Sequence, residues 1–373
     1  MHAFDMRFFA LYTDAFGGYG GIAAANRHFL RGLCASLRVE EVVALPLLQP
    51  EPVSSSVPGC IDHRTEGLGS KGRYLRALAK VLLRDRDFDL IWCGHIHLVP
   101  IALAVKALTG APVILNIHGV DAWTPTHRHV VNWSVAHVDH VISVADVTKR
   151  RFVQWSGVSP QDVYVLPNTI DFSGLAPGPK SDDLIDRYEL GNGPVLMTMG
   201  RLVGRDRRKG FDRVLEAVPG LLTEYPDLMY LIAGKGPDRE RLEIKATDLG
   251  IRDHVVFAGY VPESDKADHF RLADAYVMPS EGEGFGLVML EALACGIPAI
   301  GSTLDGTSEA LQHGRFGAVI NPADQKALVS AIRTVLDTNA AVDTNAVRSY
   351  YGKEAYRERL HALLDKIIES GSR

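Results

Sequence analysis

The chain has 373 residues, of which 46% are hydrophobic and 23% charged, and its formal net charge is −5. This composition is typical of a soluble globular protein rather than a disordered one, and the length exceeds one ordinary hydrophobic core, so we expect two domains. The negative net charge argues against a protein that binds nucleic acid.

The cysteines are scattered along the chain and contain no Cys-x-x-Cys pattern. They are Cys34, Cys60, Cys93 and Cys295. Because this spacing gives no sign of a disulfide framework, a reducing compartment is the natural interpretation. The first residues hold acids and an arginine in place of a basic stretch and an apolar segment, and no apolar run is long enough to cross a bilayer. We therefore expect a cytoplasmic protein without a membrane span.

Short apolar runs alternate with helical patterns along the chain, which is typical of parallel sheets flanked by helices. The expected strands are 7–12, 41–45, 90–93, 113–117, 141–144 and 163–165, and then 195–199, 229–233, 255–258, 275–278, 299–301 and 317–320.

A turn-rich stretch, 167–179, separates the two sets of strands. The sequence therefore predicts an N-terminal domain over 1–170, a C-terminal domain over 171–345 and a final helical segment over 346–373, with one long helix from Ala346 to Ile368. Doubly wound sheets bind ligands beyond the carboxyl ends of their strands, so we expect the active site in a cleft between the domains.

A glycine-rich stretch, 17–23, follows the first strand and precedes a helix expected over 24–37. Gly18, Gly20 and Ala23 loosely satisfy the fingerprint of dinucleotide-binding folds, but no acid ends the second expected strand to hold an adenosine ribose. Two interpretations stay open: a structural tight turn, and a loop that approaches a phosphate.

The segment from Lys71 to Arg86 predicts a helix in which basic residues stand beside apolar ones. Such a helix can lie on an anionic lipid surface, which would give the protein a peripheral contact with a membrane. An ordinary surface helix on a parallel sheet has the same pattern, so both interpretations remain.

Two short patterns resemble metal sites. Asp85 and Asp87 form Asp-x-Asp, but they precede a strand, whereas ligands of a cleft follow strands. His95 and His97 follow a strand and lack an evident third ligand. We predict no metal site from either.

Two cations flank the first loop of the second half of the chain. Arg201 ends the first strand there, and Lys209 precedes the next helix. A guanidinium and an ammonium aimed at one place offset the charge of a diphosphate, and their effect grows as a leaving group gains charge.

The most informative segment is 279–298, which contains Glu283 and Glu291. Glycines between and beside them allow backbone N–H groups to approach a ligand, and a helix expected over 287–294 turns its positive end to the loop, a place that binds phosphate. The two glutamates are about two turns of ~3.6 residues apart, so a carboxylate flanks each edge of this place. Carboxylates accept hydrogen bonds from neutral hydroxyls, so the segment suits a diphosphate with hydroxyls on both sides, as in a nucleotide-sugar.

These motifs, in this order, resemble the retaining glycosyltransferases of family GT4, and the resemblance covers nearly the whole chain. It implies the GT-B fold: an α/β protein with two Rossmann-like, doubly wound domains facing across a cleft, and a C-terminal helix that crosses back to the first domain.

The resemblance also implies roles for residues of the segment 279–298, the acidic segment. Glu283 would hydrogen-bond hydroxyls of the donor sugar, and Glu291 would hold the nucleotide ribose. The amides of Phe285, Gly286 and Leu287 would contact the sugar and the pyrophosphate.

Further roles follow from the same resemblance. Arg201 and Lys209 would stabilise the departing diphosphate without a metal. His118, at the end of the fourth expected strand, would lie at the donor sugar close to the reacting carbon. Gly20 and Gly21 would approach the donor phosphate, with the preceding glycine pair as the competing register.

The activity implied is transfer of a hexose, mannose or glucose, from a nucleoside diphosphate donor to a glycan or lipid-linked saccharide acceptor, in polysaccharide or lipopolysaccharide biosynthesis. The donor would be GDP-mannose or a UDP-hexose, and no cofactor is expected. Alternatives are a GT-B sugar-nucleotide epimerase or phosphorylase, an NAD-dependent dehydrogenase, and a silent sugar-nucleotide-binding subunit. The base, the sugar and the acceptor stay open.

Overall fold

The computed structural model describes the chain except for residues 1–5, 19, 51, 53–56, 339–340 and 372–373. The chain divides into two compact units: unit 1 comprises Met1–Ile170 and Lys353–Arg373, and unit 2 comprises Asp171–Gly352. The first crossing from one unit to the other therefore lies within the turn-rich stretch, and the second lies at Gly352.

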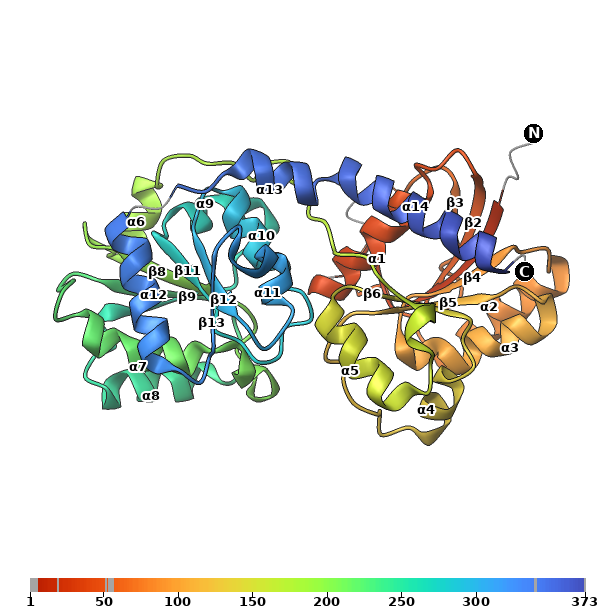
Figure 1. Ribbon diagram of the computed structural model, residues 1–373, viewed down its shortest axis with the longest axis horizontal. Helices are drawn as coiled ribbons and strands as arrows, with labels where there is room; N and C mark the ends of the chain where they lie inside the picture. Colours follow the sequence, from red (N-terminus) through yellow and green to blue (C-terminus); the bar gives the residue numbers. More distant parts are fainter. Residues whose placement is uncertain (1–5, 19, 51, 53–56, 339–340, 372–373) are drawn as a thin grey trace. The chain divides into compact units, whose positions relative to one another are not determined.

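Unit 1 contains, within its described residues, a seven-stranded parallel sheet in the order β3-β2-β1-β4-β5-β6-β7 (Figure 1). The strands are β1 (Met6–Tyr12), β2 (Val39–Pro46), β3 (Ile61–His63), β4 (Leu90–Cys93), β5 (Val113–Ile117), β6 (His140–Ser143) and β7 (Val163–Val165). The helices are α1 (Gly20–Leu33), α2 (Lys71–Arg84), α3 (Val99–Thr109), α4 (His129–Val135), α5 (Asp146–Ser156) and α14 (Lys353–Gly371).

Both faces of this sheet are covered by helices, because successive residues of a strand point to opposite sides. Phe9 and Leu11 of β1 belong to the core cluster that contains residues of α2, α3 and α5. Phe8 and Ala10 belong to the cluster on the other side, which contains residues of α1 and α14. The C-terminal helix is thus part of the core of unit 1.

Unit 2 contains, within its described residues, a six-stranded sheet in the order β10-β9-β8-β11-β12-β13. The strands are β8 (Val195–Met199), β9 (Met229–Ala233), β10 (Val255–Gly259), β11 (Ala275–Val277), β12 (Ala299–Ser302) and β13 (Ala318–Ile320). The helices are α6 (Asp182–Tyr188), α7 (Phe211–Leu221), α8 (Arg239–Asp248), α9 (Lys266–Arg271), α10 (Leu287–Ala294), α11 (Thr307–Ala310), α12 (Gln325–Thr338) and α13 (Thr344–Tyr351). Its core joins α7, α8 and α12 to the sheet.

The prediction of two Rossmann-like domains with a C-terminal helix returning to the first is confirmed. Three details differ. β3 was not predicted, the first helix begins at Gly20 instead of residue 24, and the helix expected from Ala346 to Ile368 is two helices. Gly352, between α13 and α14, has an extended backbone (φ −65°, ψ 164°), which interrupts the helical hydrogen bonds.

Cys34 and Cys60 form a disulfide, with Cα atoms 5.9 Å apart, while Cys93 and Cys295 are free and buried. The spacing of the cysteines gave no sign of this pair, so the interpretation of the thiols needs correction. Cys34 directly follows α1 and Cys60 directly precedes β3, and the pairing of β3 with β2 brings the two segments together.

No helix in the described part of the chain is both long and apolar enough to cross a bilayer.

Candidate active site

Residues 279–286, the first part of the acidic segment, lie in the loop between β11 and α10 in unit 2. This loop is at the carboxyl end of the sheet, where ligands of doubly wound folds bind. The helix predicted over 287–294 is confirmed as α10. Gly286 precedes it with φ 94°, a left-handed conformation that glycine adopts at little cost. The N–H group of Met289 donates to the carbonyl of the N-cap residue Gly286 at 2.9 Å, and the N–H groups before it precede the first helical hydrogen bonds and face this loop.

Phe285 contributes its backbone to the loop, because its side chain is buried. The ring is 3% exposed and lies edge-on to Tyr351 of α13, with 5.9 Å between ring centroids. The side chain therefore anchors the loop in the core of unit 2.

Asp305, which follows β12, stabilises the loop before α10 through hydrogen bonds. One of its oxygens accepts hydrogen bonds from the Glu283 amide (2.9 Å) and the Ser280 hydroxyl (2.5 Å), and the other accepts from the Thr307 hydroxyl (2.6 Å). Burial raises the pKa of Asp305 to about 6. Sequence reasoning assigned this residue no role in the site.

Gly306 allows this close packing. Its amide donates to the Glu283 carbonyl at 2.9 Å, and a Cβ at this position would lie 2.1 Å from the Gly284 carbonyl oxygen. Only glycine, which has no side chain, fits at position 306 against the Gly284 backbone.

Lys209 and Glu283 form an ion pair, with 2.6 Å between Nζ and Oε2 and side chains that are 18% and 22% exposed. Lys209 ends the short helix η3 (Gly204–Lys209), and the next residue, Gly210, has φ 89°. A Cβ at Gly210 would lie 2.6 Å from the Pro279 carbonyl oxygen, so the turn after Lys209 packs directly on the start of the acidic segment. The structure thus brings together two motifs that are far apart in the sequence.

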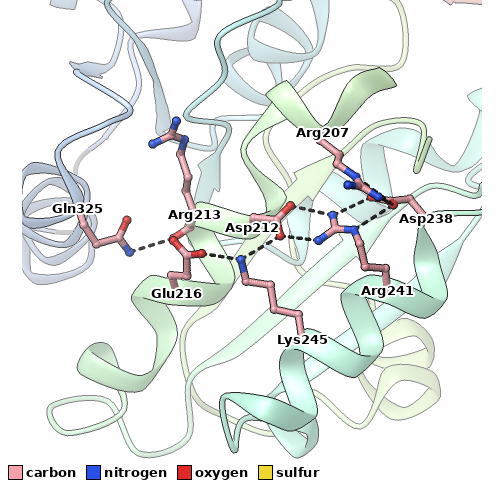
Figure 2. A network of polar contacts seen from close by, with 8 residues as sticks. All are labelled: Arg207, Asp212, Arg213, Glu216, Asp238, Arg241, Lys245 and Gln325. Carbon is pink, nitrogen blue, oxygen red and sulfur yellow. Dashed lines mark hydrogen bonds and ion pairs between the residues drawn. The ribbon is translucent and has the colours of Figure 1, made fainter. Parts of the chain in front are cut away.

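A network of ion pairs anchors α7 directly after Lys209 (Figure 2). Asp212 accepts hydrogen bonds from both terminal nitrogens of Arg241 (2.6 and 2.8 Å) and from Lys245 (2.9 Å). Asp238 accepts from Arg241 and also from Arg207 in η3. Burial opposes ionisation of Asp212, but the hydrogen bonds from Arg241 and Lys245 outweigh it and lower its pKa to about 2.

Glu291 lies on α10 and is 9% exposed. Its Oε1 accepts a hydrogen bond from Lys266 at 2.9 Å, whereas its Oε2 is buried and has no hydrogen-bond partner among the residues that the structure describes. Burial raises the pKa of Glu291, and the Lys266 ammonium opposes that shift. Buried polar atoms are normally paired, so Oε2 is an acceptor that a ligand hydroxyl would satisfy.

Lys266, at the start of α9, was missed by sequence reasoning. It also contacts Glu263 at 3.0 Å, so one ammonium links two carboxylates. Its only signal in the sequence is a lysine shortly after β10, which is too common a feature to identify a site.

Arg201 is exposed in the loop after β8. A Cβ at the preceding residue, Gly200, would lie 3.0 Å from Cδ of Lys209. The aliphatic part of Lys209 therefore runs beside the backbone next to Arg201, which places both predicted cations in one region of unit 2.

His118 lies in unit 1, immediately after β5. Its Nε2 is 3.0 Å from the Gly94 carbonyl oxygen, so we assign the proton to Nε2. Its Nδ1 is buried, with no partner among the described residues. Burial lowers the pKa of His118 to about 4, so the imidazole is neutral at physiological pH.

Gly20 and Gly21 also lie in unit 1, in the first turn of α1 rather than in a loop before it. Gly20 has φ 83°, and nothing lies within 4 Å of a Cβ built on it. Tyr19, in the same motif, is outside the described residues. The amides of this turn are at the positive end of a helix.

Among the described residues, no group of three or more His, Cys, Asp or Glu side chains could hold a metal ion.

The predicted site residues fall into two sets. The cations and the acidic segment lie in unit 2, and the histidine and the glycine pair lie in unit 1.

Two family models match the chain: Glycosyltransferase Family 4 over residues 19–173 and Glycosyl transferases group 1 over residues 182–357. The GDP-mannose-dependent alpha-(1-6)-phosphatidylinositol monomannoside mannosyltransferase of Mycolicibacterium smegmatis is 32% identical over 277 residues, 69% of each chain. The phosphatidyl-myo-inositol mannosyltransferase of Mycobacterium leprae is 32% identical and covers 72% of this chain and 71% of its own length.

Solved structures show the same fold at lower sequence identity. The Anabaena protein HepE in complex with UDP and glucose superimposes with a TM-score of 0.73 at 20% identity, over 97% of this chain and all of that one. Sucrose-phosphate synthase from Thermosynechococcus elongatus gives 0.74 at 20% identity, over 98% of this chain and all of that one.

Proposed function

Because the chain belongs to the glycosyltransferases of family 4, we propose that it transfers mannose from GDP-mannose to a hydroxyl of a lipid-linked saccharide. The observation that carries this proposal is the loop at the start of α10. The Lys209–Glu283 ion pair lies at this loop, the N-terminus of α10 begins there, and the buried carboxylate of Glu291 lies four residues into the same helix. The mycobacterial relatives, which are named as mannosyltransferases of phosphatidylinositol compounds, support the choice of sugar and acceptor.

The proposed donor complex uses each group for the chemistry that it offers. The diphosphate would lie at the amides of Phe285–Leu287, and Lys209 and Arg201 would stabilise its charge as it departs. Glu291 would accept a hydrogen bond from a ribose hydroxyl at Oε2, and Glu283 would accept from a hydroxyl of the sugar.

We further propose that the reaction proceeds with retention of configuration at the anomeric carbon. The acceptor hydroxyl would attack on the face from which the diphosphate leaves. The bond from carbon to phosphate oxygen breaks, the bond to the acceptor oxygen forms, and the acceptor proton passes to the departing phosphate. The neutral His118 would hydrogen-bond the sugar through Nδ1, which is an acceptor.

Helix α2 supports a peripheral contact with anionic lipid, where such an acceptor would reside. Leu75 and Leu83 are 52% and 79% exposed, on a helix whose exposed residues also include Arg76, Lys80 and Arg84. Sedimentation with phosphatidylglycerol vesicles tests this. The protein should co-sediment, and Leu83→Ser should weaken that binding, whereas equal binding of both proteins would refute the contact.

A thermal-shift screen of nucleotides followed by a turnover assay tests the proposed function. GDP and GDP-mannose should raise Tm more than UDP, ADP or NADH, since a ligand that binds the folded state stabilises it. GDP release should then require a phosphatidylinositol mannoside. Formation of an epimer without acceptor, dependence on inorganic phosphate, or binding of NADH would instead support an epimerase, a phosphorylase or a dehydrogenase.

A further inference from the structure

Unit 1 contains a basic cavity between α1 and the beginning of α14. Its volume is about 310 Å³, and the lining residues are His28, Arg31, Gly32, Thr169, Lys353, Tyr356 and Arg357. Three of these side chains carry a permanent positive charge and a fourth is a histidine. Of the lining residues that the structure describes, none is acidic.

The cavity lies beside the place where the two helices touch. They touch at Gly32, where a Cβ would lie 2.6 Å from Cδ2 of Leu360, and His361 lies 2.9 Å from the Gly32 carbonyl oxygen. Tyr356 and Arg357 lie one turn earlier on the same face of α14. Their side chains line the cavity.

The walls and the floor of the cavity differ in chemistry. Thr169 and Tyr356 are 2% and 4% exposed, so two hydroxyl-bearing side chains form its buried part. Arg31, Lys353 and Arg357 are half-buried around them. Hydroxyls and charged nitrogen donors arranged around one space are the groups that bind a phosphate.

A second feature of the fold adds positive potential to the same place. Lys353 is the first residue of α14, a helix of 19 residues, so the positive end of that helix lies at the cavity.

We propose that this cavity binds a small phosphate-bearing compound. Arg31, Lys353 and Arg357 would contact the phosphate oxygens, and the cavity leaves room for a second phosphate or an attached group. None of the lining residues is among the residues assigned to the candidate active site, whose cations belong to unit 2.

The position of the cavity gives such a ligand a structural consequence. Thr169 lies next to Ile170, the last residue of unit 1 before the chain passes to unit 2, and Lys353 is the first residue after the chain returns. The bound anion would therefore lie beside residues at both connections between the units.

Calorimetric titration of pyrophosphate into the full-length chain tests the proposal, with saturating GDP present to occupy the proposed donor site. The variant Arg31→Gln/Arg357→Gln should bind pyrophosphate at least about tenfold more weakly, because charge-assisted hydrogen bonds are lost. The variant Arg150→Gln/Arg187→Gln removes the same charge from exposed positions of α5 and α6 and should bind within about twofold of the wild type.

Two further arms make the result decisive. If circular dichroism shows that the double variant is unfolded, Lys353→Gln replaces it, with the same expectation. A titration with glycerophosphoinositol, the soluble headgroup of phosphatidylinositol, distinguishes a lipid headgroup from a free compound as the source of the phosphate and does not engage the lipid contact proposed for α2. Wild-type affinity for both ligands in the folded cavity variant would overturn the proposal.

Discussion

Glu291 is a buried carboxylate whose two oxygens have different surroundings. Oε1 accepts a hydrogen bond from Lys266, and Oε2 has no partner in the described part of the chain. An unpaired buried acceptor destabilises a protein by about 1–3 kcal/mol. A ligand hydroxyl that donates to Oε2 removes this penalty, so the free protein is prepared for a polyhydroxyl ligand.

The substitution Glu291→Gln keeps the size of the side chain and removes its charge. We expect the KM for the donor to rise about tenfold, which corresponds to about 1.4 kcal/mol, with little change in kcat. Steady-state kinetics over a range of donor concentrations checks this. Glu240→Gln, an exposed position on α8, serves as the control, and a wild-type KM for Glu291→Gln would refute the role of Glu291.

Lys209 faces a charge that would develop only as the diphosphate departs, so its contribution should appear in the chemical step. Lys209→Ala should lower kcat by about 100-fold and change KM less, in the range found when one stabilising donor is removed from a site. Rapid-quench measurement of a single turnover separates this step from product release. An unchanged single-turnover rate would exclude the assignment.

Some residues of the site could be predicted from the sequence and others could not. Glu283 and Lys209 stand in glycine-rich motifs, whose composition itself indicates a loop near a ligand. Lys266 lies 25 residues before Glu291, and Asp305 lies 22 residues after Glu283. Lys266 reaches Glu291 because α9 lies against α10, and Asp305 reaches Glu283 because β12 is the neighbour of β11 in the sheet. These contacts depend on the packing of whole elements, so no local pattern reveals them.

The loop before α10 depends on a second loop, after β12, that lies beneath it. Gly306 makes that contact with φ −65°, an ordinary backbone conformation, so the need for glycine here is purely steric. The geometry of the donor loop is thus determined by an element outside the acidic segment.

Gly306→Ala should displace the backbone at Gly284 and weaken donor binding by at least about tenfold, with a loss of about 1–3 kcal/mol in the free energy of unfolding. Gly220→Ala is the matched control, because nothing lies within 4 Å of its Cβ and alanine favours a helix. Urea denaturation and GDP titration of both variants give the comparison. Wild-type GDP affinity in Gly306→Ala would contradict the packing argument.

The elements were predicted where they are apolar throughout and were missed where they are polar or interrupted. β7, β11 and β13 have three residues each and were predicted, whereas β3 contains Asp62 and His63 after Ile61 and so lacks an apolar run. The α13–α14 break occurs at one glycine inside a continuous apolar pattern, since Tyr351 and Tyr356 are both buried on either side of Gly352. An apolar period alone does not distinguish one bent helix from two.

The whole chain has the α/β class that the alternation of strands and helices predicts. Each unit buries both faces of its own parallel sheet. The Cys34–Cys60 disulfide did not follow from the sequence, because the pairing of β3 with β2 that brings the two segments together was itself not predicted. Long-range contacts of this kind depend on strand order, which the sequence pattern leaves undetermined.

The Asp212 network should appear in the pH dependence of global stability. The pKa of Asp212 is lowered to about 2 in the folded state, against about 3.9 for an unfolded chain. Its stabilisation is therefore complete above about pH 4 and is lost as the pH falls through about 2. Because the carboxylate is partly exposed, we expect a contribution on the order of 1 kcal/mol.

Urea denaturation of the wild type and of Asp212→Asn across this pH range measures that contribution. The difference in unfolding free energy should be largest near neutral pH and should shrink as the pH falls below about 4. A difference that grew on acidification would contradict the assignment. Exposed Asp324→Asn provides the control for removal of a carboxylate.

The binding of a sugar-linked diphosphate at the beginning of α10 is measured most directly by a crystal structure of the protein with GDP-mannose. We expect density for the diphosphate within hydrogen-bond distance of the amides of Phe285–Leu287 and of Lys209, with a ribose hydroxyl donating to Oε2 of Glu291. Density for the nucleotide elsewhere, or an ordered donor that leaves Glu291 Oε2 without a partner, would contradict this expectation.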